Sequence, residues 1–173
     1  MTWSLGATDG GTTSSLSQTP LRAPTVFNFF FPDYEFPGLL ASAGLTTPEF
    51  QLTSDTEVVL QMNFLSGGIL NNTGNTNGLS SYTSGDGDIT LDIGPWMTTN
   101  YTSAAGVPGL VDSVGTLLLA GQLSTGARSN IISYVANTTN FPYSTPPTTT
   151  QMRDRVRGVV YQIINSPDFT IQK

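Results

Sequence analysis

Three aspartates stand close together in a glycine-rich stretch, where they could bind a metal ion. Asp86, Asp88 and Asp92 lie within Gly-Asp-Gly-Asp-Ile-Thr-Leu-Asp. Carboxylate oxygens are the ligands that calcium prefers, but the stretch lacks the bidentate glutamate and the remaining positions of an EF-hand loop. A solvated turn is therefore the competing interpretation. We name these three residues as a calcium-site hypothesis, and we expect no other cofactor.

The arginines near the C-terminus form the second charged cluster. Arg153 and Arg157 lie four residues apart near the start of a predicted helix, and therefore on one face of it. Positive charge at this end opposes the helix macrodipole, so the arginines need another role. We expect structural ion pairs, with anion binding as the alternative. The expected partners are acidic residues of the N-terminal half, namely Asp33, Glu35 and Glu49.

Two of these acids flank an aromatic residue, in the order Asp33, Tyr34, Glu35. Two carboxylates near an aromatic ring are typical of glycosidase sites. Sequence neighbours in an extended stretch point in different directions, however, which disfavours catalysis here. The chain contains no histidine and no cysteine, so Ser-His-Asp, Cys-His and thiolate chemistry are excluded, as are disulfides. We predict no catalytic residue in this chain.

Six aromatic rings gather in one proline-bounded segment of ten residues. They belong to Phe27, Phe29, Phe30, Phe31, Tyr34 and Phe36. Such rings bury about 150 to 250 Å² each, so the six could remove on the order of 1,000 Å² from water, worth roughly 25 kcal/mol before opposing terms. A soluble monomer rarely exposes that much apolar surface. We expect the segment either to fill the chain's own core or to dock on a protein partner.

Composition narrows the setting of the protein. The 173 residues carry a formal charge of −6, which disfavours binding to a phosphate backbone and hence to nucleic acid. No apolar run is long enough to cross a membrane. Charged residues make up only 10% of the chain, a polar but weakly charged composition that suits an exported protein. Met1 is not followed by a signal-peptide pattern, so we expect any signal to lie outside this chain.

Apolar spacing and capping residues predict mainly helical structure. A helix is expected over 55–66, with an apolar face that includes Val58 and Met62. A second helix is expected near 108–121, and a third begins after a cap at Ser124. The fourth begins with a capping box over 148–151 and stops at a proline.

The remaining segments are predicted to be irregular. A polar loop is expected over 67–87 and a proline-bounded loop over 141–147, and residues 89–93 permit one short strand. The predicted fold is mainly α, with four or five helices, long ordered loops and at most one short β-hairpin. Residues 1–19 are predicted to form a flexible or extended arm, and 20–173 a single domain.

Five blocks in order carry a family resemblance over nearly the whole chain after residue 16. They are Arg-Ala-Pro-Thr-Val-Phe-Asn-Phe-Phe at 22–30, Pro-Asp-Tyr at 32–34, Ala-Gly-Leu-Thr-Thr-Pro-Glu-Phe-Gln at 43–51, Leu-Leu-Leu-Ala-Gly-Gln-Leu at 117–123, and Arg-Val-Arg-Gly-Val-Val-Tyr-Gln-Ile-Ile-Asn-Ser-Pro-Asp-Phe at 155–169. The chain resembles the C-terminal part of the bacterial family numbered eighteen hundred among domains of unknown function. The resemblance implies an exported protein, a longer parent chain, and no known catalytic residues.

These observations favour a non-enzymatic exported module that packs or assembles through its aromatic segment. The expected partner is a protein, either the N-terminal region that family members carry or other copies of this chain. Two alternatives stay open at this stage. The chain could be the C-terminal half of a hydrolase-like enzyme whose catalytic residues lie elsewhere, or a self-assembling surface or filament subunit.

Overall fold

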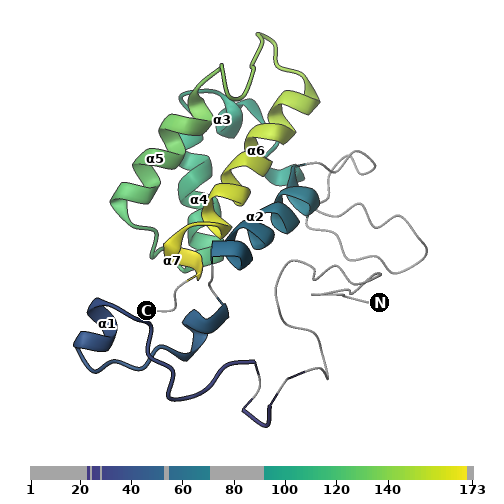
Figure 1. Ribbon diagram of the computed structural model, residues 1–173. Helices are drawn as coiled ribbons and strands as arrows, with labels where there is room; N and C mark the ends of the chain where they lie inside the picture. The colour runs from purple at the N-terminus through teal and green to yellow at the C-terminus, as the bar shows by residue number, and fades with distance from the viewer. Residues whose placement is uncertain (1–22, 24, 28, 53–54, 71–91, 171–173) are drawn as a thin grey trace, which may run out of the picture. The chain divides into compact units, whose positions relative to one another are not determined.

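The computed structural model describes residues 23, 25–27, 29–52, 55–70 and 92–170 (Figure 1). The chain divides into two units, Met1–Phe64 and Leu65–Lys173, and each is described by itself. Every element in the described part is an α-helix or a 3-10 helix. The mainly α prediction is confirmed. The prediction of one domain over 20–173 and of an arm over 1–19 stays a prediction.

The described part of the first unit consists of short helical elements joined by turns and irregular chain. A four-residue helix, α1 (Leu39–Ser42), is followed by a 3-10 turn, η1 (Pro48–Leu52), and by the start of α2 (Asp55–Ile69). Hydrogen bonds hold the aromatic segment to η1 and the residue before it: Phe31 N donates to Gln51 Oε1 at 2.6 Å, and Thr47 N donates to Tyr34 O at 2.7 Å. The segment is therefore ordered without belonging to a regular element.

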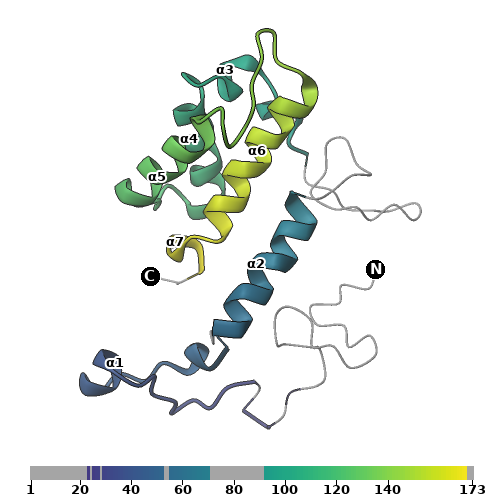
Figure 2. The ribbon, with the colours of Figure 1, turned by 45° about the horizontal axis from the view of Figure 1, so that its top comes forward.

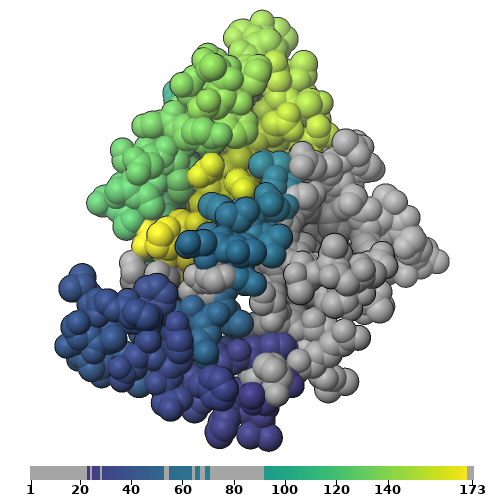
Figure 3. All heavy atoms as spheres, viewed as in Figure 1, coloured from purple at the N-terminus to yellow at the C-terminus, as the bar shows by residue number. Residues whose placement is uncertain are grey.

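In the described part of the second unit, three longer helices form the framework. These are α4 (Val107–Leu119), α5 (Thr125–Ala136) and α6 (Thr149–Ile164), and each packs against the other two. Two four-residue helices, α3 (Thr99–Thr102) and α7 (Pro167–Thr170), lie at opposite ends of α6 (Figure 2). A 3-10 turn, η2 (Gly94–Trp96), precedes α3. In the space-filling view, α5 and α6 form a continuous surface (Figure 3).

Local sequence explains where the longer helices begin and end. The side chain of Ser124 caps α5 by accepting a hydrogen bond from Ala127 N, and Thr148 with Gln151 forms the capping box of α6. Helix α4 ends because Ala120 and Gly121 adopt left-handed backbone, with φ of 50° and 80°. All three boundaries were predicted from the sequence.

The core of the second unit is aliphatic. Its fully buried residues on α4 and α6 repeat at helical spacing, as expected for helices that bury one face. They are Val107, Leu110, Val111 and Val114 on α4, and Val156, Val159, Val160 and Ile163 on α6. Ile131 and Val135 of α5 close the third side. This packing fixes the direction in which the remaining side chains of α6 point.

One local prediction needs correction, and another falls mostly outside the described residues. Helix α2 continues to Ile69, so its last turn enters the segment 67–87 that was predicted to be loop; Ile69 is buried in the core of the second unit, which accounts for the extension. The predicted strand over 89–93 lies mostly outside the described residues, and Ile93 is a buried residue just before η2. Among the helices of the described ranges, none is long and apolar enough to cross a membrane.

Candidate functional site

A buried arginine links several segments of the second unit. Arg155, in the second turn of α6, has no solvent-exposed surface. Its guanidinium donates to Thr102 O at 2.7 Å, to Phe141 O at 3.2 Å and to Ala136 O at 3.5 Å. The three carbonyls belong to α3, to the loop after α5 and to the end of α5. One side chain of α6 therefore binds α3, the end of α5 and the loop that follows α5, at sequence distances of 14 to 53 residues.

An aromatic ring completes the surroundings of Arg155. The guanidinium carbon lies 4.2 Å from the ring centroid of Tyr143, a cation–π distance. The Tyr143 hydroxyl is 2.9 Å from Thr102 Oγ1, and Thr102 Oγ1 donates in turn to Thr98 O. Burial lowers the pKa of Arg155, and the nearby Tyr143 acts in the opposite direction. Arg155, Tyr143 and Thr102 therefore form a packed polar network. The bond from Arg155 to Phe141 O anchors the loop between α5 and α6.

The loop between α5 and α6 is fixed at its second half as well. Gln151 Oε1 accepts hydrogen bonds from Thr148 N at 3.0 Å, Ser144 N at 3.2 Å and Ser144 Oγ at 2.8 Å. The bond from Thr148 belongs to the capping box, and the bonds from Ser144 tie the loop to the same amide. This explains why a proline-rich stretch without regular structure is ordered.

A second arginine of α6 is buried beside this loop. Arg157 is 1% exposed, and burial lowers its pKa, helped by the positive charge of Arg153 and opposed by the negative charge of Asp154. A pocket of about 350 Å³ opens next to it. Gln151, Asp154, Phe141 and Pro142 also line this pocket. Asp154 and Arg157, which carry opposite charges, thus line the pocket opposite the apolar residues Phe141 and Pro142. The pocket is therefore neither clearly acidic nor clearly basic.

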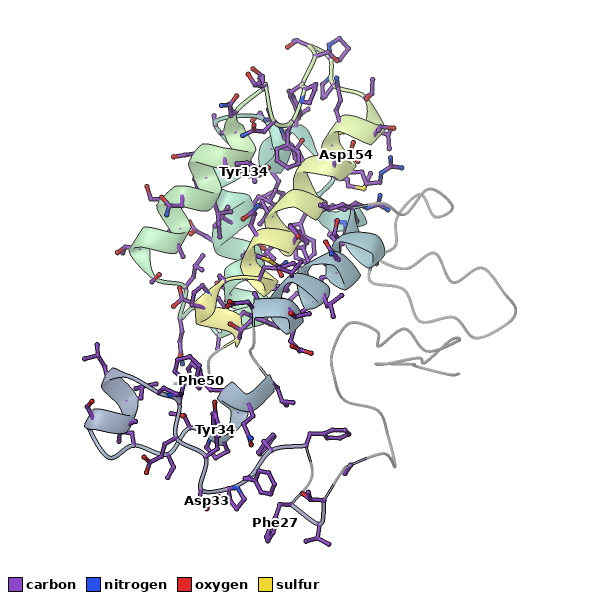
Figure 4. All side chains as sticks on the ribbon, in the orientation of Figure 1. Phe27, Asp33, Tyr34, Phe50, Tyr134 and Asp154 are labelled. Atoms are coloured by element: carbon purple, nitrogen blue, oxygen red, sulfur yellow. The ribbon has the colours of Figure 1, made fainter. Side chains whose placement is uncertain are left out.

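A contact between two aromatic rings holds Phe141, one of the apolar residues that line the pocket. The ring of Tyr134 on α5 meets the ring of Phe141 nearly at right angles, with centroids 5.7 Å apart. This edge-to-face geometry is the arrangement that aromatic pairs prefer. Figure 4 labels Tyr134 on α5 and Asp154 on α6. Phe141 therefore packs on α5 and lines the pocket, while its carbonyl binds Arg155.

The aromatic segment of the first unit is mostly accessible. Phe27 is 55% exposed, Phe31 48% and Phe36 40%, while Phe29, Phe30 and Tyr34 are half-buried. One ring contact is local, between Phe36 and Phe50 with centroids 5.4 Å apart. No described side chain between residues 23 and 63 is buried. The segment therefore does not form a closed core within this unit.

The structure describes only some of the charged groups in the predicted ion pairs together. The Nε atom of Arg153 lies 3.5 Å from a carboxylate oxygen of its neighbour Asp154. The predicted pairs of Arg153 and Arg157 with Asp33, Glu35 and Glu49 would join residues of the two units, and they stay a prediction. A pair that the sequence did not suggest links α4 to α5: Arg128 donates two hydrogen bonds to Asp112, at 2.6 and 2.7 Å.

The calcium hypothesis lies largely outside the described residues. Asp86 and Asp88 belong to the segment 71–91, which the structure does not describe. Asp92 is exposed, and its carboxylate accepts a hydrogen bond from Gly94 N at 2.8 Å, which closes a local turn. Across the described ranges, no group of three or more acidic residues is placed to hold a metal ion.

Sequence reasoning missed the role of Arg155. It gave roles only to Arg153 and Arg157, although Arg155 is followed by Val156 and stands one turn before Val159, both of which are core residues. An arginine on the apolar face of a helix was the available signal. No protein-family model matches the chain, and neither the curated proteins nor the solved structures contain a match.

Proposed function

We propose that this chain is a non-enzymatic assembly module of an exported bacterial protein, and that its aromatic segment packs on another protein surface. The observation that carries the proposal is the absence of any buried side chain among the described residues 23–63, in a stretch this rich in phenylalanine. Exposed apolar surface on this scale marks interaction sites. The family resemblance supports the exported bacterial setting.

Further apolar side chains extend this surface beyond the rings. Val26 and Leu39 are almost fully exposed, and Leu45 is 51% exposed. The hydrogen bonds to Gln51 and Thr47 hold the backbone of the segment in place, so less conformational entropy is lost when it docks. An ordered, apolar, accessible segment is well suited to bind the region that precedes it in family members, or another protein.

Substitution of one exposed ring tests whether the segment serves a partner or the chain's own core. We expect Phe31→Ser to change the free energy of unfolding by less than about 0.5 kcal/mol, as is usual for surface positions. A core phenylalanine would cost about 3 to 5 kcal/mol when truncated. Urea unfolding of both proteins measures the difference. A loss in the core range would overturn the proposal.

A second readout measures the accessible surface directly. The neutral dye Nile red fluoresces on exposed apolar surface, and we expect Phe31→Ser to reduce its fluorescence. Leu117→Ser is the matched control, because Leu117 is the one large apolar side chain of α4 that is exposed, at 63%. It should leave the dye signal nearly unchanged. Equal effects of both substitutions would contradict a binding surface centred on the aromatic segment.

A further inference from the structure

The aromatic segment lies in the most acidic part of the described chain. Residues 23–64 contain five acids and neither lysine nor arginine. The five are Asp33, Glu35, Glu49, Asp55 and Glu57. All are exposed except Glu57, which is half-buried. The nearest cation in sequence is Arg22, just before the described residues.

Acids and exposed rings alternate within the segment itself. Asp33 and Glu35 stand between Phe31 and Phe36, and all four side chains are exposed. Figure 4 labels Phe27, Asp33 and Tyr34 along this stretch. A partner that covers the rings therefore also covers or borders carboxylates. Leaving such carboxylates unpaired at an interface costs free energy, whereas opposite charges across it steer binding and add specificity.

Within the described residues, a second copy of this chain does not offer the matching charge. In the described part of the second unit, Arg128 pairs with Asp112 and Arg153 lies beside Asp154. Arg155 and Arg157 are buried. Two copies also carry a formal charge of −6 each, so they repel at low ionic strength. The same sign disfavours anionic lipid surfaces.

We propose that the partner of the aromatic segment is a different protein surface, apolar and rich in lysine or arginine. This inference rests on the proposed assembly function and narrows its partner: a basic heterologous surface is favoured over another copy of the chain. Phe31 and its neighbouring rings supply apolar contact, and Asp33, Glu35 and Glu49 pair with cations at the edge of that contact. Binding weakens with added salt because these pairs are exposed.

Two fluorescent amphipathic helical peptides test the charge preference. They share one leucine pattern and differ only in their polar face, which is lysine in one and glutamate in the other. Fluorescence anisotropy with the full chain should give roughly tenfold or greater preference for the lysine peptide at low salt. The preference should shrink at about 1 M salt, where charges are screened within a few ångströms.

Variants locate the binding on the segment. Glu35→Gln should lower the affinity for the lysine peptide about threefold, the size expected for the loss of one exposed charge pair. Asp92→Asn removes the same charge from the second unit and keeps a side-chain acceptor for Gly94 N, so it should leave affinity unchanged. Phe31→Ser should weaken binding further than Glu35→Gln. Equal losses from Glu35→Gln and Asp92→Asn would show unspecific attraction and overturn the inference.

The remaining outcomes separate this inference from the proposed function. Equal binding of both peptides, lost in Phe31→Ser, would leave an apolar docking segment but overturn the basic partner. Light scattering that shows dimers at low salt, lost in the same variant, would identify a second copy as the partner and also overturn it. Failure of the proposed function itself shows instead as a core-sized stability loss in Phe31→Ser, which the unfolding experiment reports independently.

Discussion

The ring of Phe141 occupies the space that a side chain on Gly158 would need. A Cβ atom placed on Gly158 would lie 2.5 Å from Cζ and 2.7 Å from Cε1 of the Phe141 ring, closer than carbon atoms approach without a shift. Glycine at this position of α6 therefore lets the loop after α5 lie directly on the helix. The carbonyl of the same phenylalanine binds Arg155, so ring and backbone are fixed together.

Substitution of this glycine tests the contact. We expect Gly158→Ala to lower the free energy of unfolding by about 1 to 3 kcal/mol, because the added methyl group overpacks the site. Gly126→Ala on α5 is the matched control: apart from its chain neighbours and the backbone of its own helix, no heavy atom lies within 4 Å of the added Cβ. There the better helix propensity of alanine should stabilise the protein slightly, by less than the roughly 0.5 to 1 kcal/mol of a mid-helix site, because Gly126 lies in the first turn of α5. Chemical unfolding of the three proteins measures both changes.

The opposite signs expected for these two alanine variants make the comparison decisive. If Gly158→Ala were as stabilising as Gly126→Ala, the ring could not lie against α6 as described. A smaller side chain at the loop position should also restore part of the loss. Gly158→Ala combined with Phe141→Leu is therefore expected to be less destabilised than the sum of the two single variants.

Replacement of Arg155 tests whether it anchors the loop. Arg155→Met keeps the length and removes the donors, which leaves the carbonyls of Thr102 and Phe141 without their partner. We expect the free energy of unfolding to fall by about 3 kcal/mol. Each hydrogen bond from a charged donor contributes more than about 1 kcal/mol, and each buried carbonyl left without a donor costs a similar amount. Hydrogen exchange should increase most over 137–147. Arg153→Met, on the same helix, should cause a smaller loss without this local pattern.

Arg155→Lys separates geometry from charge in the same experiment. Lysine carries one compact ammonium group and cannot reproduce the planar guanidinium that reaches carbonyls on several sides. We expect it to be nearly as destabilised as Arg155→Met. Full stability in Arg155→Lys would show that charge alone suffices and that the separate carbonyl contacts do not fix the loop.

The longer helices could be predicted because their signals are local. Ser124 and the pair Thr148 and Gln151 satisfy the first free backbone N–H groups of α5 and α6, and such caps depend only on residues three apart. Gly121 ends α4 for an equally local reason, its freedom to adopt positive φ. The mainly α fold follows from these boundaries and the apolar spacing between them.

Tertiary contacts could not be predicted in the same way. Val58 and Met62 share the apolar spacing of α2 with Ile69, yet they are 41% and 40% exposed while Ile69 is buried. Apolar spacing identifies the apolar face of a helix, but it does not show which turns of that face pack against other parts of the protein. Arg155 shows the same limit: its partners stand 14 to 53 residues away in sequence. No pattern of neighbouring residues contains that information.

The pair of Asp112 and Arg128 predicts a pH dependence of stability. The hydrogen bonds from Arg128 lower the pKa of Asp112, so the folded carboxylate holds its charge to a lower pH than the unfolded one. The pair therefore stabilises the fold above the ordinary pKa of aspartate, near pH 4, and this contribution disappears as pH falls through the lowered value. The contribution is small because the pair is largely exposed.

Thermal unfolding of wild type and Asp112→Asn, from about pH 7 down to about pH 2, measures this contribution. We expect the wild type to be slightly more stable at neutral pH and the two proteins to converge in acid. Salt at about 1 M should reduce the difference at neutral pH, because exposed charges are screened. In an Arg128→Gln background the same aspartate substitution should lose its pH-dependent effect. A difference that persists there would assign the effect to Asp112 alone rather than to its bridge between α4 and α5.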